Sequence, residues 1–172
     1  MEISDGGHFE NLGIYELVRR RVDLIIAFDG EADRATALPA LVSLSRRIEE
    51  DFGAKLTLDS NLDELMPFAS NEARYPNDAK FANIPCAKAT IQYANDPSHT
   101  TTLIYVKASL IDQAPFVAKG YRAQRPDYPN ESTANQFYSP EQFDAYRELG
   151  IACTRRAVRL HWATIAGILR RR

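Results

Sequence analysis

The stretch Asp23-Leu24-Ile25-Ile26-Ala27-Phe28-Asp29-Gly30 decides the fold that we predict for this chain of 172 residues. Its unbroken apolar run, closed by Asp29-Gly30, predicts a short strand that is buried on both faces. The segment from Phe9 to Arg21 leads into this strand, and its apolar residues have the spacing of a helix. A helix that is followed directly by a doubly buried strand indicates an α/β unit with parallel strand pairing.

Further along the chain, local signals predict another helix and a hairpin. The helix is expected from Pro39 to Phe52, because proline suits a first helical turn and Gly53 suits the position after the last one. Apolar and polar residues alternate over 87–93 and again over 101–108, with the turn-forming Asn95-Asp96-Pro97-Ser98 between them. This pattern predicts an antiparallel hairpin over about residues 87–108.

A last helix is expected to begin after Ser139, which is followed by Pro140 and then by Gln142 in the arrangement of a capping box. Gly150 is expected to interrupt this helix. Beyond it, apolar residues at helical spacing predict a segment with one apolar face: Val158, Trp162, Ile165 and Leu169. No repeat or flexible linker divides the chain. The sequence therefore predicts a single α/β domain over residues 1–172, with a mixed sheet that has a parallel core, the hairpin and packing helices.

The composition excludes some classes of protein and leaves others open. A formal net charge of −2 gives no general reason to expect nucleic-acid binding. Cys86 and Cys153 are the only two cysteines, so a disulfide framework is not expected and a reducing compartment is favoured. The sequence has no signal peptide and no apolar run of about 18 residues. We therefore expect a protein that is cytoplasmic or peripherally associated with a membrane.

The segment Asp5-Gly6-Gly7 is the first candidate for chemistry. Two successive glycines permit backbone angles that other residues avoid, so they can hold Asp5 on a tight turn with its carboxylate exposed. In that position the carboxylate can orient or deprotonate a nucleophile. The alternative is that Asp5 caps the helix that follows, as acidic residues often do.

A longer string contains this segment and reads Ser4-Asp5-Gly6-Gly7-His8-Phe9-Glu10-Asn11-Leu12-Gly13-Ile14-Tyr15-Glu16-Leu17. It resembles the second catalytic motif of bacterial patatin-like phospholipases, which are relatives of the plant patatins and the cytosolic phospholipases A2. Two further stretches, 103–110 and 128–150, are similar to the distal region of the same family and follow in the same order. The resemblance therefore covers most of the chain.

This resemblance implies a serine acyl hydrolase that uses a Ser-Asp dyad and needs no metal or cofactor. In the family the serine lies in a Gly-x-Ser-x-Gly elbow, and an upstream glycine-rich loop donates N–H groups to the oxyanion. The role of the dyad carboxylate maps onto Asp5, which would accept the serine proton. His8 and Asn11 are candidates for the substrate-binding mouth, and Glu10 and Asn11 for ordering the first helical turn. The implied substrates are phospholipids or other acyl lipids.

The sequence also departs from the family pattern. None of its eight glycines forms a Gly-x-Ser-x-Gly motif, and the glycine-rich loop is absent too. Ser4 adjoins Asp5, but on a strand it would point to the opposite face. Because both missing elements precede the aspartate motif in the family, we expect the C-terminal portion of a patatin-like domain, inactive by itself. The alternative is a noncatalytic lipid-surface or protein-interaction module.

Two other features each allow two interpretations. Asp29-Gly30-Glu31-Ala32-Asp33 follows the predicted strand and forms either a plain turn or part of a ligand site, because ligands often bind beyond the carboxyl ends of parallel strands. The last helix carries a cluster of cations, which would rest on anionic lipid or form the solvated side of a core-facing helix: Arg155, Arg156, Arg159 and Arg170-Arg171-Arg172. A metal site is not expected, since the later histidines have no carboxylate or cysteine at ligand spacing.

Overall fold

The computed structural model of the chain describes residues 9–59, 62–69, 79–132, 134 and 137–171. A four-stranded sheet with the order β1-β6-β5-β2 forms its centre. The four strands are β1 (Leu24–Asp29), β2 (Ala54–Leu58), β5 (Cys86–Tyr93) and β6 (Asp96–Lys107). Strand β1 is parallel to β6, whereas β5 is antiparallel to both β6 and β2. The predicted mixed α/β sheet and its antiparallel hairpin are thereby confirmed.

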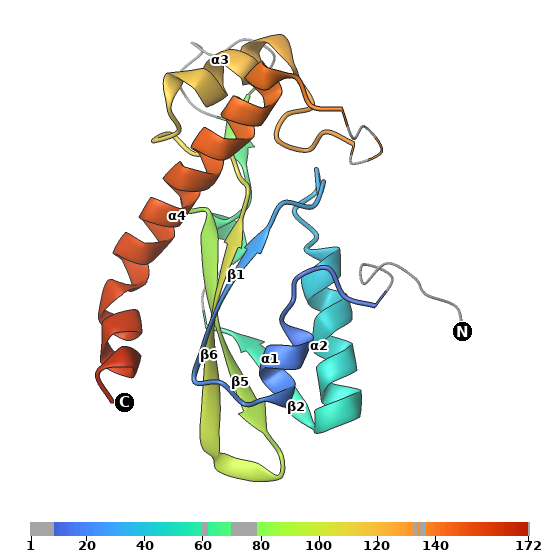
Figure 1. Ribbon diagram of the computed structural model, residues 1–172, viewed down its shortest axis with the longest axis vertical. Helices are drawn as coiled ribbons and strands as arrows, with labels where there is room; N and C mark the ends of the chain where they lie inside the picture. Colours follow the sequence, from blue (N-terminus) through green and yellow to red (C-terminus); the bar gives the residue numbers. More distant parts are fainter. Residues whose placement is uncertain (1–8, 60–61, 70–78, 133, 135–136, 172) are drawn as a thin grey trace.

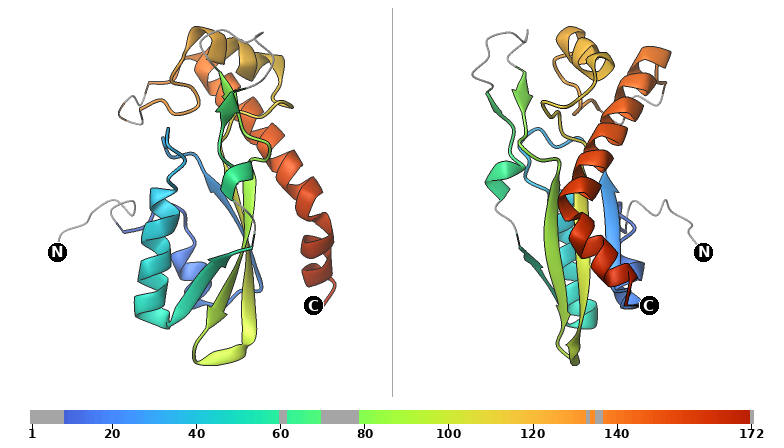
Figure 2. Two further views of the ribbon diagram at one scale, coloured as in Figure 1. Left: turned by 180° about the vertical axis from the view of Figure 1, so that it is seen from behind. Right: turned by 90° about the vertical axis from the view of Figure 1, so that its left-hand side faces the viewer.

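Helices cover the sheet on both sides, so that the molecule has three layers (Figure 1; Figure 2). Helices α1 and α2 lie on one face and α4 crosses the other, with α3 packed against α4. The helices are α1 (Tyr15–Arg19), α2 (Pro39–Phe52), α3 (Phe116–Gln124) and α4 (Pro140–Leu169). A short 3-10 turn, η2 (Leu62–Glu64), precedes a small second sheet of β3 (Phe68–Ala69) and β4 (Lys80–Phe81).

Each face of the sheet has its own hydrophobic core. Successive side chains of a strand point to opposite faces. Strand β6 therefore sends Leu103 and Tyr105 into the core beneath α1 and α2, and Ile104 and Val106 into the core beneath α4. The second half of β6 is buried almost without a break because both of its faces are covered. Strand β6 thus contributes buried side chains to both cores.

Within the described part of the chain, strand β1 is covered on one face only, which corrects the prediction that it is buried on both. Its residues Ile25 and Ala27 are buried, but Ile26 and Phe28 are 38% and 56% exposed. The physical reason is that β1 lies at the edge of the sheet, while α4 packs mainly on β6. The edge strand therefore presents two large apolar side chains beside its outer backbone groups.

The first helix is much shorter than the predicted Phe9–Arg21, whereas the second has the predicted bounds. Gly13 takes the left-handed conformation, with φ +68°, and α1 begins only after it. The backbone N–H of Leu12 donates to the Glu10 carboxylate, a local bond of the kind that competes with helix formation. Helix α2 ends at Gly53, whose left-handed conformation (φ +60°) is typical of the residue after a helix.

The last helix begins as predicted. Ser139 is the N-cap, and its Oγ accepts a hydrogen bond from Gln142 N at 3.2 Å. Within the described residues, the return bond of a capping box, from Ser139 N to the Gln142 side-chain oxygen, is not made, and the Gln142 amide donates to Glu131 at 3.0 Å. The cap is therefore the simple serine cap.

Helix α4 does not stop at Gly150 but continues to Leu169. Its non-helical backbone angles occur at His161 (φ −110°, ψ 15°). Leu149 and Cys153 are buried against the sheet on either side of Gly150, and this burial offsets the helical cost of glycine, which is about 1 kcal/mol. Among the described residues, no helix has both the length and the apolar character needed to cross a bilayer.

Candidate functional site

The residues selected by the Asp5 motif lie only partly within the described chain. Asp5 and His8 are outside the described residues, and Asn11 is exposed and lines a cavity of about 290 Å³. The walls of this cavity come from the segment after the motif, the segment after β1, and α2. We call it the motif-side cavity and define it by Phe9, Asn11, Glu31, Ser43 and Arg47.

The carboxylate at the start of α1 belongs to Glu10. Its Oε1 accepts a hydrogen bond from Leu12 N at 2.5 Å, and its Oε2 accepts one from Tyr15 N at 3.4 Å. The N-cap of the helix is Ile14, which has no side-chain capping bond. The prediction that Glu10 orders the first helical turn is confirmed. Because Ile14 occupies the N-cap position, Asp5 is not the N-cap of this helix.

Arg47 ties the segment after the motif to α2. Its guanidinium lies over the Phe9 ring, 4.2 Å from the centroid, and donates a hydrogen bond to the Phe9 carbonyl. In the same cavity, the Oε2 atom of Glu31 is buried and has no hydrogen-bond partner among the described residues. A buried carboxylate oxygen in this condition is costly, so it marks the cavity as a place where a ligand or a further chain segment is expected.

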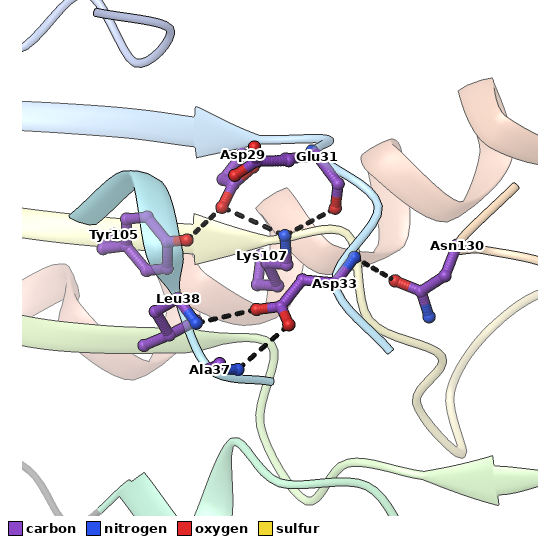
Figure 3. Close-up of polar contacts among 8 residues, drawn as sticks. All are labelled: Asp29, Glu31, Asp33, Ala37, Leu38, Tyr105, Lys107 and Asn130. Atoms are coloured by element: carbon purple, nitrogen blue, oxygen red, sulfur yellow. Dashed lines mark hydrogen bonds and ion pairs between the residues drawn. The ribbon is translucent and has the colours of Figure 1, made fainter. Parts of the chain in front are cut away.

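A buried ion pair joins the carboxyl ends of β1 and β6. In the parallel register, Asp29 lies directly opposite Lys107. Lys107 Nζ is 3.0 Å from Asp29 Oδ2, at the ends of two neighbouring strands (Figure 3). The side chains of Lys107 and Asp29 are only 3% and 2% exposed, so both charges have left water almost completely.

Two further groups complete this pair. Tyr105 lies two residues before Lys107 on the same face of β6, and its hydroxyl donates to Asp29 Oδ2 (Figure 3). Lys107 also donates to the Glu31 carbonyl at 2.7 Å. Burial, together with the hydrogen bond to the Asp29 carboxylate, raises the pKa of Tyr105, so the hydroxyl stays a donor. We call Asp29, Tyr105 and Lys107 the strand-end cluster.

Asp33 holds the segment after β1 in an uncommon backbone conformation. Thr36 and Leu38 have positive φ angles of 52° and 53°, which β-branched and bulky residues rarely adopt. The Asp33 carboxylate accepts hydrogen bonds from Ala37 N at 3.0 Å and Leu38 N at 2.7 Å. Its own N–H donates to Asn130 Oδ1 at 2.9 Å (Figure 3). Of the two interpretations of residues 29–33, a turn or part of a ligand site, the hydrogen bonds of Asp33 therefore support the turn.

A second cavity, of about 250 Å³, lies beyond the ends of β1 and β6. From the sequence, the segment 29–33 is one candidate for a ligand site, and Asp33 lines this cavity; the other walls were not predicted, because they meet only through the β1–β6 register. A signal was present nonetheless: an acidic residue ends one apolar strand and a lysine ends another, and parallel pairing brings such ends together. We call it the strand-end cavity, and its polar lining includes Arg34, Lys80, Lys107, Ser109, Arg122 and Asn130.

Neither thiol is placed to act as a nucleophile. Cys86 and Cys153 are buried in the core beneath α4, and Cys153 Sγ donates to the Ser109 carbonyl at 3.3 Å. Burial raises the pKa of Cys86 to about 11 and that of Cys153 to about 12, which leaves almost no thiolate near neutral pH. In the described part of the chain, no three or more His, Cys, Asp or Glu side chains gather as a metal site.

Comparison with known proteins gives no family assignment. No protein-family model, curated protein or solved structure matches the chain. The resemblance of the Asp5 string to patatin-like phospholipases therefore stays a prediction, and the functional argument rests on the residues and their geometry.

We expect both cysteines to be unreactive while the protein is folded. At about pH 8, a thiol-reactive disulfide reagent should label neither native thiol and both denatured ones, because the raised pKa values suppress the thiolate and burial blocks access. Cys86→Ser and Cys153→Ser variants assign any signal to one residue. Rapid labelling of a native thiol would contradict the burial of that cysteine.

Proposed function

We propose that this chain supplies the general base, Asp5, of a patatin-like lipid acyl hydrolase. The serine of the dyad would come from sequence outside these 172 residues. The string from Ser4 to Leu17 supports this proposal, together with the two distal stretches that follow it in the family's order. The mixed α/β sheet agrees with the fold class that the resemblance implies.

The capping of α1 is the observation that carries the proposal. Acidic residues ahead of a helix are commonly there to cap it, but at α1 the N-cap is Ile14 and the nearby carboxylate is Glu10. Capping of α1 therefore does not explain the aspartate of the Asp5-Gly6-Gly7 segment, which favours the catalytic interpretation. In addition, the residues that directly follow the motif line a cavity with a buried carboxylate oxygen.

In the proposed reaction, Asp5 accepts the serine hydroxyl proton while the serine oxygen attacks the ester carbonyl carbon. The tetrahedral intermediate collapses, the bond from the acyl carbon to the alcohol oxygen breaks, and the alcohol leaves with the proton held by Asp5. Water then attacks the acyl-serine, with Asp5 taking a proton from water and returning one to the serine. These steps use neither a metal nor a cofactor, and the substrates would be phospholipids or other acyl lipids.

The exposed outer edge of β1 supports the proposal that a further chain segment packs beside this strand. Parallel strands are normally covered on both faces, yet Ile26 and Phe28 are exposed. Within the described residues, β1 pairs with β6 alone. A further strand beside β1, with its own covering helix, would bury both side chains. We place the portion that carries the serine on this edge.

Replacement of Asp5 by asparagine tests the assigned role. In a longer chain that includes the upstream serine segment, Asp5→Asn should lower ester hydrolysis by about 10²–10⁴-fold, because an amide cannot accept the serine proton. Hydrolysis of a chromogenic ester and of phospholipid vesicles measures this loss. Asp144→Asn is the matched control and should keep full activity, since Asp144 is an exposed residue of α4 that pairs with Arg147.

Undiminished hydrolysis by the Asp5→Asn enzyme would contradict the role of Asp5 as the general base. The 172-residue chain alone is expected to give no turnover. Turnover of this short chain that survives Asp5→Asn would reveal a nucleophile elsewhere in it.

A second candidate function, a peripheral lipid-surface module, is favoured by the last turns of α4. The apolar stripe does not face the core along its whole length: Ile165 is 6% exposed, whereas Trp162 and Leu169 are each 61% exposed. Arg159, three residues before Trp162, and Arg170 and Arg171, directly after Leu169, are exposed too. An exposed tryptophan beside cations is typical of a helix that rests on anionic lipid.

Vesicle co-sedimentation tests this second function. We expect binding to phosphatidylglycerol vesicles that weakens with salt, and little binding to phosphatidylcholine vesicles. Trp162→Ala should weaken the binding by about tenfold, since it removes the largest apolar contact. Phe116→Ala is the control, because Phe116 is 85% exposed on α3. Equal binding to both lipids, or an equal loss in the control variant, would count against the module.

A further inference from the structure

Four positively charged residues, each from a different segment, line the strand-end cavity. Arg34 comes from the connection between β1 and α2, Lys80 from β4, Lys107 from the end of β6, and Arg122 from α3. Among the described residues that line it, the carboxylates are Asp33 and Asp127. Once the pairing of Lys107 with the buried Asp29 is counted, the lining keeps an excess of one positive charge, in a protein whose net charge is negative.

Both carboxylates of the cavity are already engaged by its own walls. The Asp33 carboxylate accepts two backbone N–H groups, and Asp127 pairs with Arg34 at 2.7 Å. These contacts reduce the repulsion that the two carboxylates exert on an anion, although Asp33 keeps its negative charge. Lys80 and Arg122 add two further positive charges to the same lining.

Uncharged donors line the cavity as well. Asn130 uses its Oδ1 to accept the Asp33 N–H, which directs its Nδ2 donor away from Asp33 (Figure 3). Ser109 adds a hydroxyl group to the lining, on a residue that is nearly buried. Guanidinium groups, an amide and a hydroxyl together are the donors that match the oxygens of a phosphate group.

The cavity walls are linked to each other before any ligand arrives. The bonds Asp33–Asn130 and Arg34–Asp127 join the segment after β1 to the 126–130 loop. The site also lies beyond the carboxyl ends of the parallel strands β1 and β6, where α/β proteins usually bind ligands. Preorganised walls reduce the entropy cost of binding.

We propose that the strand-end cavity binds the phosphate group of a phosphate ester. A volume of about 250 Å³ suits a phosphate with a short substituent better than a large ligand. The source of the phosphate is either a soluble phosphoester or a lipid head group. This inference goes beyond the proposed hydrolase function and does not depend on Asp5.

Calorimetric titration of the whole chain with inorganic phosphate and with glycerol 3-phosphate tests the proposal, at ionic strength held constant with sodium chloride. We expect saturable binding of both. The paired change Lys80→Gln with Arg122→Gln should raise Kd by about tenfold or more, because it removes two charge-assisted contacts. The matched control is Arg46→Gln with Lys55→Gln, which removes two exposed cations from outside the cavity and should leave Kd unchanged.

Competition with vesicles identifies the source of the phosphate. Displacement of glycerol 3-phosphate from the whole chain by phosphatidylglycerol vesicles assigns a lipid head group, and no displacement assigns a soluble phosphoester. Absence of saturable binding, or an equal change of Kd in the control pair, also overturns it; melting temperatures without phosphate verify that each variant is folded.

Discussion

The buried ion pair between Asp29 and Lys107 fixes how β1 lies against β6. Removing both charges from water costs several kcal/mol for each, and that cost is offset only while each charged atom keeps its partners. Lys107 has Asp29 and the Glu31 carbonyl, while Asp29 also accepts from the Tyr105 hydroxyl and from Glu31 N at 2.7 Å. A slip of one residue would turn Asp29 to the other face of the sheet, so the pair selects one register.

Both cavities depend on this register. Glu31 is bonded to the ion pair through its backbone N–H and carbonyl, and its carboxylate lines the motif-side cavity. Two residues further, Asp33 donates to Asn130 and so brings the segment after β1 to the loop that lines the strand-end cavity. One buried pair therefore positions a wall of each proposed site, although it lines only one of them.

Local signals predicted several elements from neighbouring residues, and they failed where a local side-chain bond competed with the helix or where distant contacts decide. The bounds of α2 and the serine cap of α4 follow from residues next to them. The helix predicted from Phe9 fails because the Glu10 carboxylate captures a nearby N–H, and Gly150 does not end α4 because core contacts outweigh its helical cost. The sequence displays the charges of Asp29 and Lys107, but their meeting requires a pairing between strands far apart in the chain. The role proposed for Asp5 comes from the sequence motif around it, since Asp5 lies outside the described residues.

A double-mutant cycle on Asp29 and Lys107 tests most directly whether this pair is the central constraint. Unfolding in urea gives the free energy of unfolding for the native chain, Asp29→Asn, Lys107→Met and the double variant. Each single change leaves a buried charge unpaired and should cost about 3–5 kcal/mol, and the coupling energy should be at least about 2 kcal/mol. The same cycle on the partly exposed pair of Asp59 and Lys88, 3.1 Å apart, should give about 1 kcal/mol or less. Effects at Asp29 and Lys107 that add to within about 0.5 kcal/mol would contradict a central role for the pair.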